Sequence, residues 1–146
     1  MNEPEHEHKR LRALVGRWKT TGQTDPSAGG AEIDAIDTYE WLPGGFGLLH
    51  TVDARVGGQR VEGAEVIGFD ATRGAYVTLY VGTDGPTSYE AHLTDQGGDL
   101  VWRMRSERTR FTGSFSAERT AIAGHWELLG EDGNWRPWMD ITLTKS

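Results

Sequence analysis

Apolar residues recur at every second position along most of this chain, and such alternation predicts β-strands. Ile33, Ala35 and Tyr39 share one parity, for example, and so do Leu48 and His50. Short segments rich in glycine and aspartate separate the alternating segments, as tight hairpin turns do. We therefore predict ten strands, at residues 16–23, 31–41, 46–56, 59–69, 75–81, 87–94, 99–105, 109–117, 121–129 and 134–144.

The first part of the chain has a different period. Between residues 5 and 15, the apolar residues Leu11, Leu14 and Val15 follow helical spacing. Acidic residues precede basic ones along this segment, which suits the helix dipole, and Gly16 is a suitable end. We predict one short helix with a narrow apolar stripe, as expected of a lid or plug over one end of a sheet.

The turns are too short to hold crossover helices, so every pair of neighbouring strands should be antiparallel. A meander of this length normally closes on itself, because closure removes exposed strand edges. The last hairpin would then pair with the first strand, at Gly16-Arg17-Trp18. We predict an all-β protein: a ten-stranded antiparallel up-and-down β-barrel with one short N-terminal helix. We expect a single domain over residues 1–146, with residues 1–8 as a flexible lead-in.

Composition suggests that the barrel is not filled completely. Only 36% of the residues are hydrophobic, yet the chain has 20 glycines, six tryptophans and four tyrosines. A barrel with a partly polar interior accounts for the first two features, because short strands need many turns and a cavity needs fewer core aliphatics. The tryptophans and tyrosines suggest aromatic-lined space. The net charge of −7 argues against nucleic acid and anionic membranes as partners, and without cysteine there is no thiolate metal site. No signal peptide or membrane-spanning apolar run is visible, so we expect a cytoplasmic protein.

Motifs at the two ends of the chain resemble those of calycins, the superfamily of lipocalins and fatty-acid-binding proteins. The pattern is similar to that of a bacterial domain-of-unknown-function family of lipocalin-like barrels. Its residues are Leu11-x-x-Leu14-Val15-Gly16-x-Trp18 near the start, and Ile122-x-Gly124-x-Trp126-Glu127 and Asp132-Gly133 with Trp135 near the end. The resemblance implies a calycin barrel over nearly the whole chain.

Nitrobindin is a related ten-stranded haem-binding barrel, in which the proximal histidine follows a proline at the start of the last strand. The matching stretch here is Arg136-Pro137-Trp138-Met139, so Trp138 stands where that histidine would be. An indole nitrogen is a donor only and cannot ligate iron. The resemblance therefore implies a nitrobindin-like barrel that has lost its haem site, and we expect no cofactor.

The candidate site consists of polar and aromatic residues that could face the interior. His50 lies on the apolar parity of its strand, and two interpretations remain open: a hydrogen-bonded core histidine, or a polar contact or acid–base group in the cavity. Tyrosine and tryptophan offer apolar area with one polar handle each. Trp18 and Trp126 are expected to plug the closed end. The predicted ligand-binding residues are Tyr39, Trp41, His50, Tyr80, Trp102 and Trp138.

Several other charged or titratable side chains are further candidates for the interior. Arg103 and Arg105 alternate with apolar residues, and we favour an outward position because an unpaired inward charge is costly; inward, they would resemble the arginine that holds a carboxylate in fatty-acid barrels. The orientation of His92 and His125 stays open. Glu40 and Asp140 have no paired-carboxylate or nucleophile motif around them, so no catalytic residue is assigned, and we predict no metal site.

The leading hypothesis is a barrel that binds a small apolar or aromatic ligand in its interior. One alternative is an enzyme of isomerase, cyclase or lyase type with His50 as general base. Another is a haem protein that uses a different histidine. The sequence leaves the identity of the ligand open, and also homodimerisation through the barrel exterior.

Overall fold

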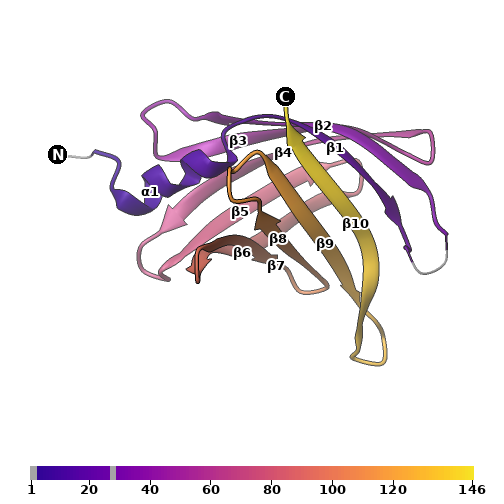
Figure 1. Ribbon diagram of the computed structural model, residues 1–146. Helices are drawn as coiled ribbons and strands as arrows, with labels where there is room; N and C mark the ends of the chain where they lie inside the picture. The colour runs from indigo at the N-terminus through magenta and orange to yellow at the C-terminus, as the bar shows by residue number, and fades with distance from the viewer. Residues whose placement is uncertain (1–2, 27–28) are drawn as a thin grey trace.

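The predicted fold class is confirmed. The computed structural model describes residues 3–26 and 29–146, and within these residues ten antiparallel strands close into a barrel (Figure 1). The elements are α1 (His6–Arg10), the 3-10 helix η1 (Leu11–Leu14), β1 (Gly16–Thr24), β2 (Glu32–Trp41), β3 (Gly47–Val56), β4 (Gln59–Asp70), β5 (Ala75–Gly82), β6 (Gly85–Gln96), β7 (Asp99–Arg105), β8 (Thr109–Phe115), β9 (Ala121–Leu129) and β10 (Trp135–Lys145).

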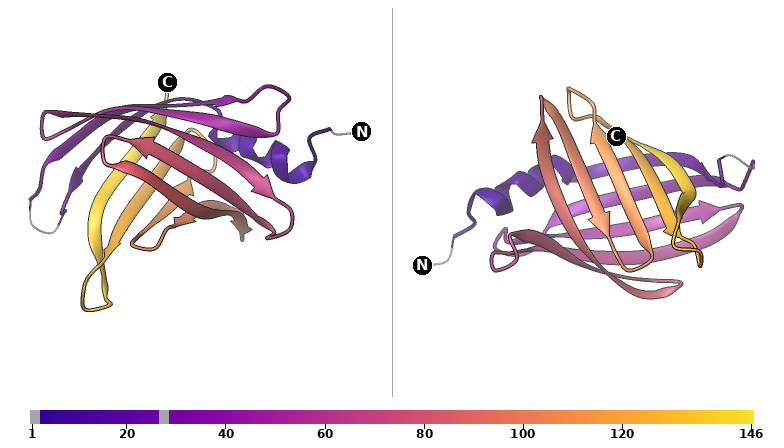
Figure 2. Two further views of the ribbon diagram at one scale, coloured as in Figure 1. Left: turned by 180° about the vertical axis from the view of Figure 1, so that it is seen from behind. Right: turned by 90° about the horizontal axis from the view of Figure 1, so that it is seen from below.

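The barrel closes through its first and last strands. β1 pairs with β2 on one side and with β10 on the other, so that Trp18 lies opposite Asp37 and Lys145. All other neighbours in the barrel are also neighbours in sequence, which is the order of an up-and-down meander (Figure 2). The helix begins at His6, inside the segment 1–8 expected to be a lead-in, of which residues 1–2 lie outside the described residues.

The helical segment covers one end of the barrel. Leu11 and Leu14 of η1 are fully buried, and the Trp18 indole beneath them donates a hydrogen bond of 2.8 Å to the Leu14 carbonyl. The Tyr76 hydroxyl donates to the Glu7 carbonyl at 2.6 Å and so attaches α1 to β5. The large side chains that are most completely buried therefore lie at the helix end, and the interior space lies nearer the opposite end.

A β-bulge near the start of β10 changes which side chains face inward. The pairing of β10 with β9 shifts between Pro137 and Met139. Proline has no backbone N–H and is found at bulges for this reason. The extra residue is Trp138, and both Trp138 and Met139 line the interior, although adjacent strand residues ordinarily face opposite sides.

Candidate functional site

The interior of the barrel contains a cavity of about 480 Å³. It extends from Trp102 and Leu143, near the core, to the end opposite the helix, where Gln59 begins β4 and Thr83 lies in the turn between β5 and β6. Seven aromatic residues contribute to its wall, and Trp126 lies at the centre of a cluster of their rings. The Trp126 ring centroid lies 4.9 Å from that of Phe111, 5.8 Å from that of Trp138 and 5.9 Å from that of Tyr89.

Pairs of glycines on neighbouring strands give two of the aromatic rings their places along the wall. Gly63 lies opposite Gly82, and a Cβ atom on either residue would come within 2.3 Å of the Tyr80 hydroxyl. Gly113 lies opposite Gly124, and a Cβ atom there would come within 2.7 Å or 2.6 Å of the Phe111 ring. Because these glycines have no side chains, the Tyr80 and Phe111 rings lie against the backbone. The part of the cavity that these rings would otherwise fill stays open.

A buried polar cluster lies at the deep end of the cavity. The His50 imidazole is placed between two carboxylates, with Nε2 2.7 Å from Asp37 Oδ1 and Nδ1 2.9 Å from Glu65 Oε1. The Thr20 hydroxyl donates to Asp37 Oδ2 at 2.5 Å, and the Thr78 hydroxyl donates to Glu65 Oε2 at 2.8 Å. We call these five residues the carboxylate–histidine cluster.

Strand register brings the carboxylate–histidine cluster together. His50 on β3 lies directly opposite Glu65 on β4 and opposite Tyr39 on β2, and Asp37 is two residues from Tyr39 on the same face. The Tyr39 ring stacks on the imidazole, with centroids 4.0 Å apart and planes inclined by 8°. Asp37 and Glu65 are 8% and 4% exposed, so both carboxyl groups are buried and hydrogen-bonded.

The two carboxylates determine the charge of His50. Burial by itself lowers the pKa of the imidazole, but the hydrogen bonds and charges of Asp37 and Glu65 outweigh it and raise the pKa from 6.5 to about 9. His50 is therefore an imidazolium at neutral pH, with both N–H groups donated to the carboxylates. Burial, followed by the charges of Asp37 and Glu65, raises the pKa of Tyr39 well above 10, so its phenol stays neutral.

We expect nuclear magnetic resonance to find protons on both ring nitrogens of His50 at pH 7.5. The reason is its pKa of about 9, which the neighbouring carboxylates cause. Two-bond ¹H–¹⁵N spectra of the imidazoles measure this directly, and a His50→Gln variant identifies the resonance. A ring nitrogen with the chemical shift of an unprotonated imidazole at this pH would contradict the assignment.

Five of the six residues predicted for the site line the cavity: Tyr39, His50, Tyr80, Trp102 and Trp138. The sixth, Trp41, lies at the last position of β2, outside the cavity and 39% exposed. It has the inward parity, but the helix end of the barrel is already filled by Trp18 and Leu48. The expectation that Trp126 plugs the closed end is wrong, because Trp126 lines the cavity, whereas Trp18 does close that end.

Sequence reasoning missed the two carboxylates of the cluster. Asp37 has the parity of Ala35 and Tyr39, and Glu65 has that of Ile67, which is the signal that marks both as inward. The other charged candidates lie on the outside. Arg103, Arg105, His92 and His125 are all exposed, and His125 Nδ1 is 2.7 Å from Asp140 Oδ1 on the barrel surface.

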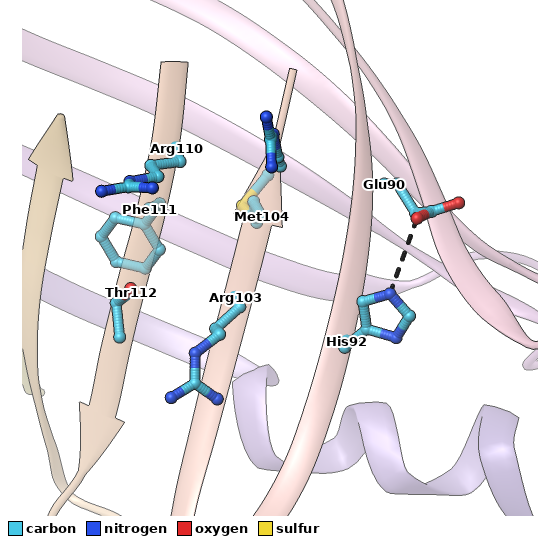
Figure 3. Close-up of a pocket in the computed structure, with 8 residues that line it drawn as sticks. Glu90, His92, Arg103, Met104, Arg110, Phe111 and Thr112 are labelled. Carbon is cyan, nitrogen blue, oxygen red and sulfur yellow. Dashed lines mark ion pairs between the residues drawn. The ribbon is translucent and has the colours of Figure 1, made fainter. Parts of the chain in front are cut away.

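A second hollow, of about 260 Å³, lies on the outer face of β6, β7 and β8 (Figure 3). Its side chains include Arg103, Arg105 and Arg110, and the ion pair between His92 Nε2 and Glu90 Oε2, at 3.6 Å. The guanidinium carbon of Arg110 lies 4.3 Å from the Trp135 ring centroid, outside the barrel. Half of the eight residues that border the hollow are exposed, and its volume is about half that of the interior cavity, so the interior cavity is the candidate site.

Within residues 3–26 and 29–146, no group of three or more His, Cys, Asp or Glu residues is arranged to hold a metal ion. No helix there is long and apolar enough to cross a membrane.

Fold and cavity together define this molecule as a closed antiparallel β-barrel with an aromatic, partly acidic interior. The chain belongs to the family described as "Protein of unknown function (DUF1579)", whose model matches residues 3–145. The crystal structure of Rv2717c from M. tuberculosis is similar to it, with a TM-score of 0.73 and 10% sequence identity over 99% of each chain. At this identity, the likeness shows the fold alone. No curated protein matches the chain.

Proposed function

We propose that the protein is a calycin-like barrel that binds a small, mostly apolar or aromatic molecule in its interior. The observation that carries this proposal is the cavity of about 480 Å³, which is lined by aromatic rings and reaches the end opposite the helix. Ligand pockets of proteins have volumes of about 300–1,000 Å³ and combine apolar walls with a few placed polar groups. Burial against Trp126 and Trp138 would supply affinity, and the carboxylate–histidine cluster would orient the ligand.

The geometry of His50 favours binding over catalysis by this residue. A general base must be unprotonated at the working pH and within reach of a substrate proton. His50 donates both ring N–H groups to carboxylates, and its pKa of about 9 keeps it protonated near pH 7. The enzyme hypothesis with His50 as base therefore has no support from the arrangement of the site.

The cavity does not fit a haem ligand set either. Among the described residues that line it, His50 is the one histidine, and its nitrogens lie 2.7 Å and 2.9 Å from carboxylate oxygens. Neither nitrogen has a lone pair free for iron. Trp138, which also lines the cavity, is a donor only.

The test of binding is a saturable change in fluorescence when the neutral dye N-phenyl-1-naphthylamine is titrated into the protein. We expect Gly63→Ala to weaken this binding about tenfold, because the new methyl group displaces the Tyr80 ring into the cavity. Gly68→Ala is the matched control on the same strand, since a Cβ atom there meets nothing within 4 Å.

Two outcomes would count against the proposal. If the dye shows no saturable binding to the unmodified protein, the cavity is not a binding site for apolar molecules. If Gly63→Ala and Gly68→Ala bind the dye equally well, the dye binds elsewhere. Thermal unfolding of both variants checks that the barrel is intact, and a cost of about 1–3 kcal/mol is expected for the overpacked Gly63→Ala protein.

A further inference from the structure

We propose that the cavity selects ligands that carry a positively charged nitrogen on an apolar or aromatic body, and that Asp37 and Glu65 supply the counter-charge. This inference rests on the proposed binding function and specifies the chemical class of the ligand.

The charged groups at the deep end of the cavity favour a cationic ligand over an anionic one. One imidazolium, His50, lies between two carboxylates, Asp37 and Glu65. With both carboxylates ionised and the imidazole protonated, the cluster has a formal charge of −1. A cationic ligand would compensate this charge in a place of low dielectric, where it counts most.

The remaining charged residues of the lining do not reverse this balance. They are Arg60 and Asp84, both exposed at the end opposite the helix. Arg60 is already engaged outside the barrel, with Nε 3.1 Å from Glu62 Oε1 and Nη2 3.6 Å from Asp53 Oδ1. Among the described residues of the lining, no cationic side chain is therefore comparable to the inward arginine that would hold a carboxylate ligand, and Arg103 and Arg105 are exposed.

The hydrogen bonds of the cluster lead to the same class of ligand. Both N–H groups of His50 are used by carboxylates, so the cluster has no N–H donor to offer an anion. Each carboxylate oxygen of Asp37 and Glu65 accepts one hydrogen bond from within the cluster. A carboxylate oxygen has room for about two, so acceptor capacity remains. An ammonium group supplies donors only and matches this surplus.

The aromatic rings near the cluster also favour a cationic ligand. Tyr39 lies on one side of the cluster, stacked on His50, and the Trp126–Trp138 pair lies farther along the wall. The faces of tyrosine and tryptophan rings attract cations, by about 0.5–2 kcal/mol. The net charge of −7 adds a long-range field that raises the local concentration of cations over that of anions.

The test uses three probes that share one ring system and differ in charge: 2-naphthylmethylamine as the cation, 2-naphthalenemethanol as the neutral probe and 2-naphthoate as the anion. Isothermal titration calorimetry at pH 7.5 measures all three against the unmodified protein. We expect the amine to bind at least about tenfold more tightly than the alcohol, corresponding to about 1.4 kcal/mol, and the carboxylate to bind most weakly. Equal affinities for amine and alcohol, or tighter binding of the carboxylate, would overturn the inference.

Variants test whether the cluster causes the preference for the amine. Asp37→Asn keeps the shape of the side chain and removes one negative charge from the cluster, and we expect it to abolish the preference for the amine while the alcohol still binds. Asp34→Asn is the control, because it removes the same charge from the exposed, outward face of the same strand, where Asp34 pairs with Lys19. An unchanged preference in Asp37→Asn would refute the role of the cluster.

The outcomes separate this inference from the proposed function. If the neutral dye and the alcohol bind but the amine has no advantage, the cavity binds ligands and the inference is wrong. If neither the dye nor any of the three probes binds, the binding function itself is wrong. Should Asp37→Asn fail to fold, the probe series on the unmodified protein still decides the ligand class.

Discussion

Replacing His50 with alanine is expected to lower the free energy of unfolding by about 3–5 kcal/mol. The substitution removes the cation between two buried carboxylates, and it leaves Asp37 Oδ1 and Glu65 Oε1 without their donors. It also removes the ring on which Tyr39 stacks. Urea denaturation at pH 7, followed by circular dichroism, measures the loss.

The matched control is His125→Ala. The His125 side chain is 63% exposed, and its nitrogen lies 2.7 Å from Asp140, so it has the same kind of partner without the burial. Surface pairs of this kind contribute about 0–1 kcal/mol. If His50→Ala costs no more than His125→Ala, the carboxylate–histidine cluster does not stabilise the barrel as described.

The stabilisation from His50 should also depend on pH in a defined direction. Its pKa in the folded protein, about 9, lies above the ordinary value of 6.5, so the folded state binds the proton more tightly than the unfolded state. The contribution is fully present below pH 6.5 and is lost as the pH rises through 9. Between pH 6.5 and 9.5, we expect the difference in unfolding free energy between the unmodified protein and His50→Ala to shrink by roughly 2–3 kcal/mol.

The barrel could be predicted because short stretches of sequence determine each strand and each turn. Alternation with a period of two marks each strand, and turn residues such as Gly57 and Gly58, both with positive φ, mark where each hairpin reverses. The predicted pairing of the first strand with the last hairpin is also found. Ten short strands joined by tight turns have few arrangements other than closure.

The cluster could be predicted only in part, because its five members come from five strands. Parity places His50 inward and does the same for Asp37 and Glu65, but charged residues are generally expected outside. Partners 13 and 15 residues away along the chain meet His50 only through the register of β2, β3 and β4. A buried carboxylate becomes plausible only when its partner is known, and one sequence does not provide the partner.

The aromatic predictions show a second limit of pattern reasoning. Parity alone places Trp138 with the outward residues of β10, and the bulge after Pro137 turns it inward. Trp41 has inward parity, yet it ends its strand beyond the filled part of the core. Parity tells which side of the sheet a residue faces, whereas its depth along the barrel axis depends on how the neighbouring strands are staggered.

Trp18→Ala is expected to cost about 3–5 kcal/mol of unfolding free energy. The Trp18 ring is 0% exposed, contacts Phe115 edge-on with centroids 6.5 Å apart, and lies beneath the helical segment. Its removal leaves a void between Leu11, Leu14 and the barrel, and it frees the Leu14 carbonyl from its donor. Thermal and urea denaturation measure the loss.

Trp135→Ala tests whether this cost belongs to the position or to tryptophan in general. Trp135 lies on the outside of the barrel, where Arg110 lies over its ring, and its removal should cost about 1 kcal/mol. Trp18→Phe then separates packing from hydrogen bonding, because it keeps an aromatic ring but removes the indole donor to Leu14. Equal losses for Trp18→Ala and Trp135→Ala would mean that the buried Trp18 contributes no more to stability than a tryptophan on the outside of the barrel, and the account of the helix end of the core would be wrong.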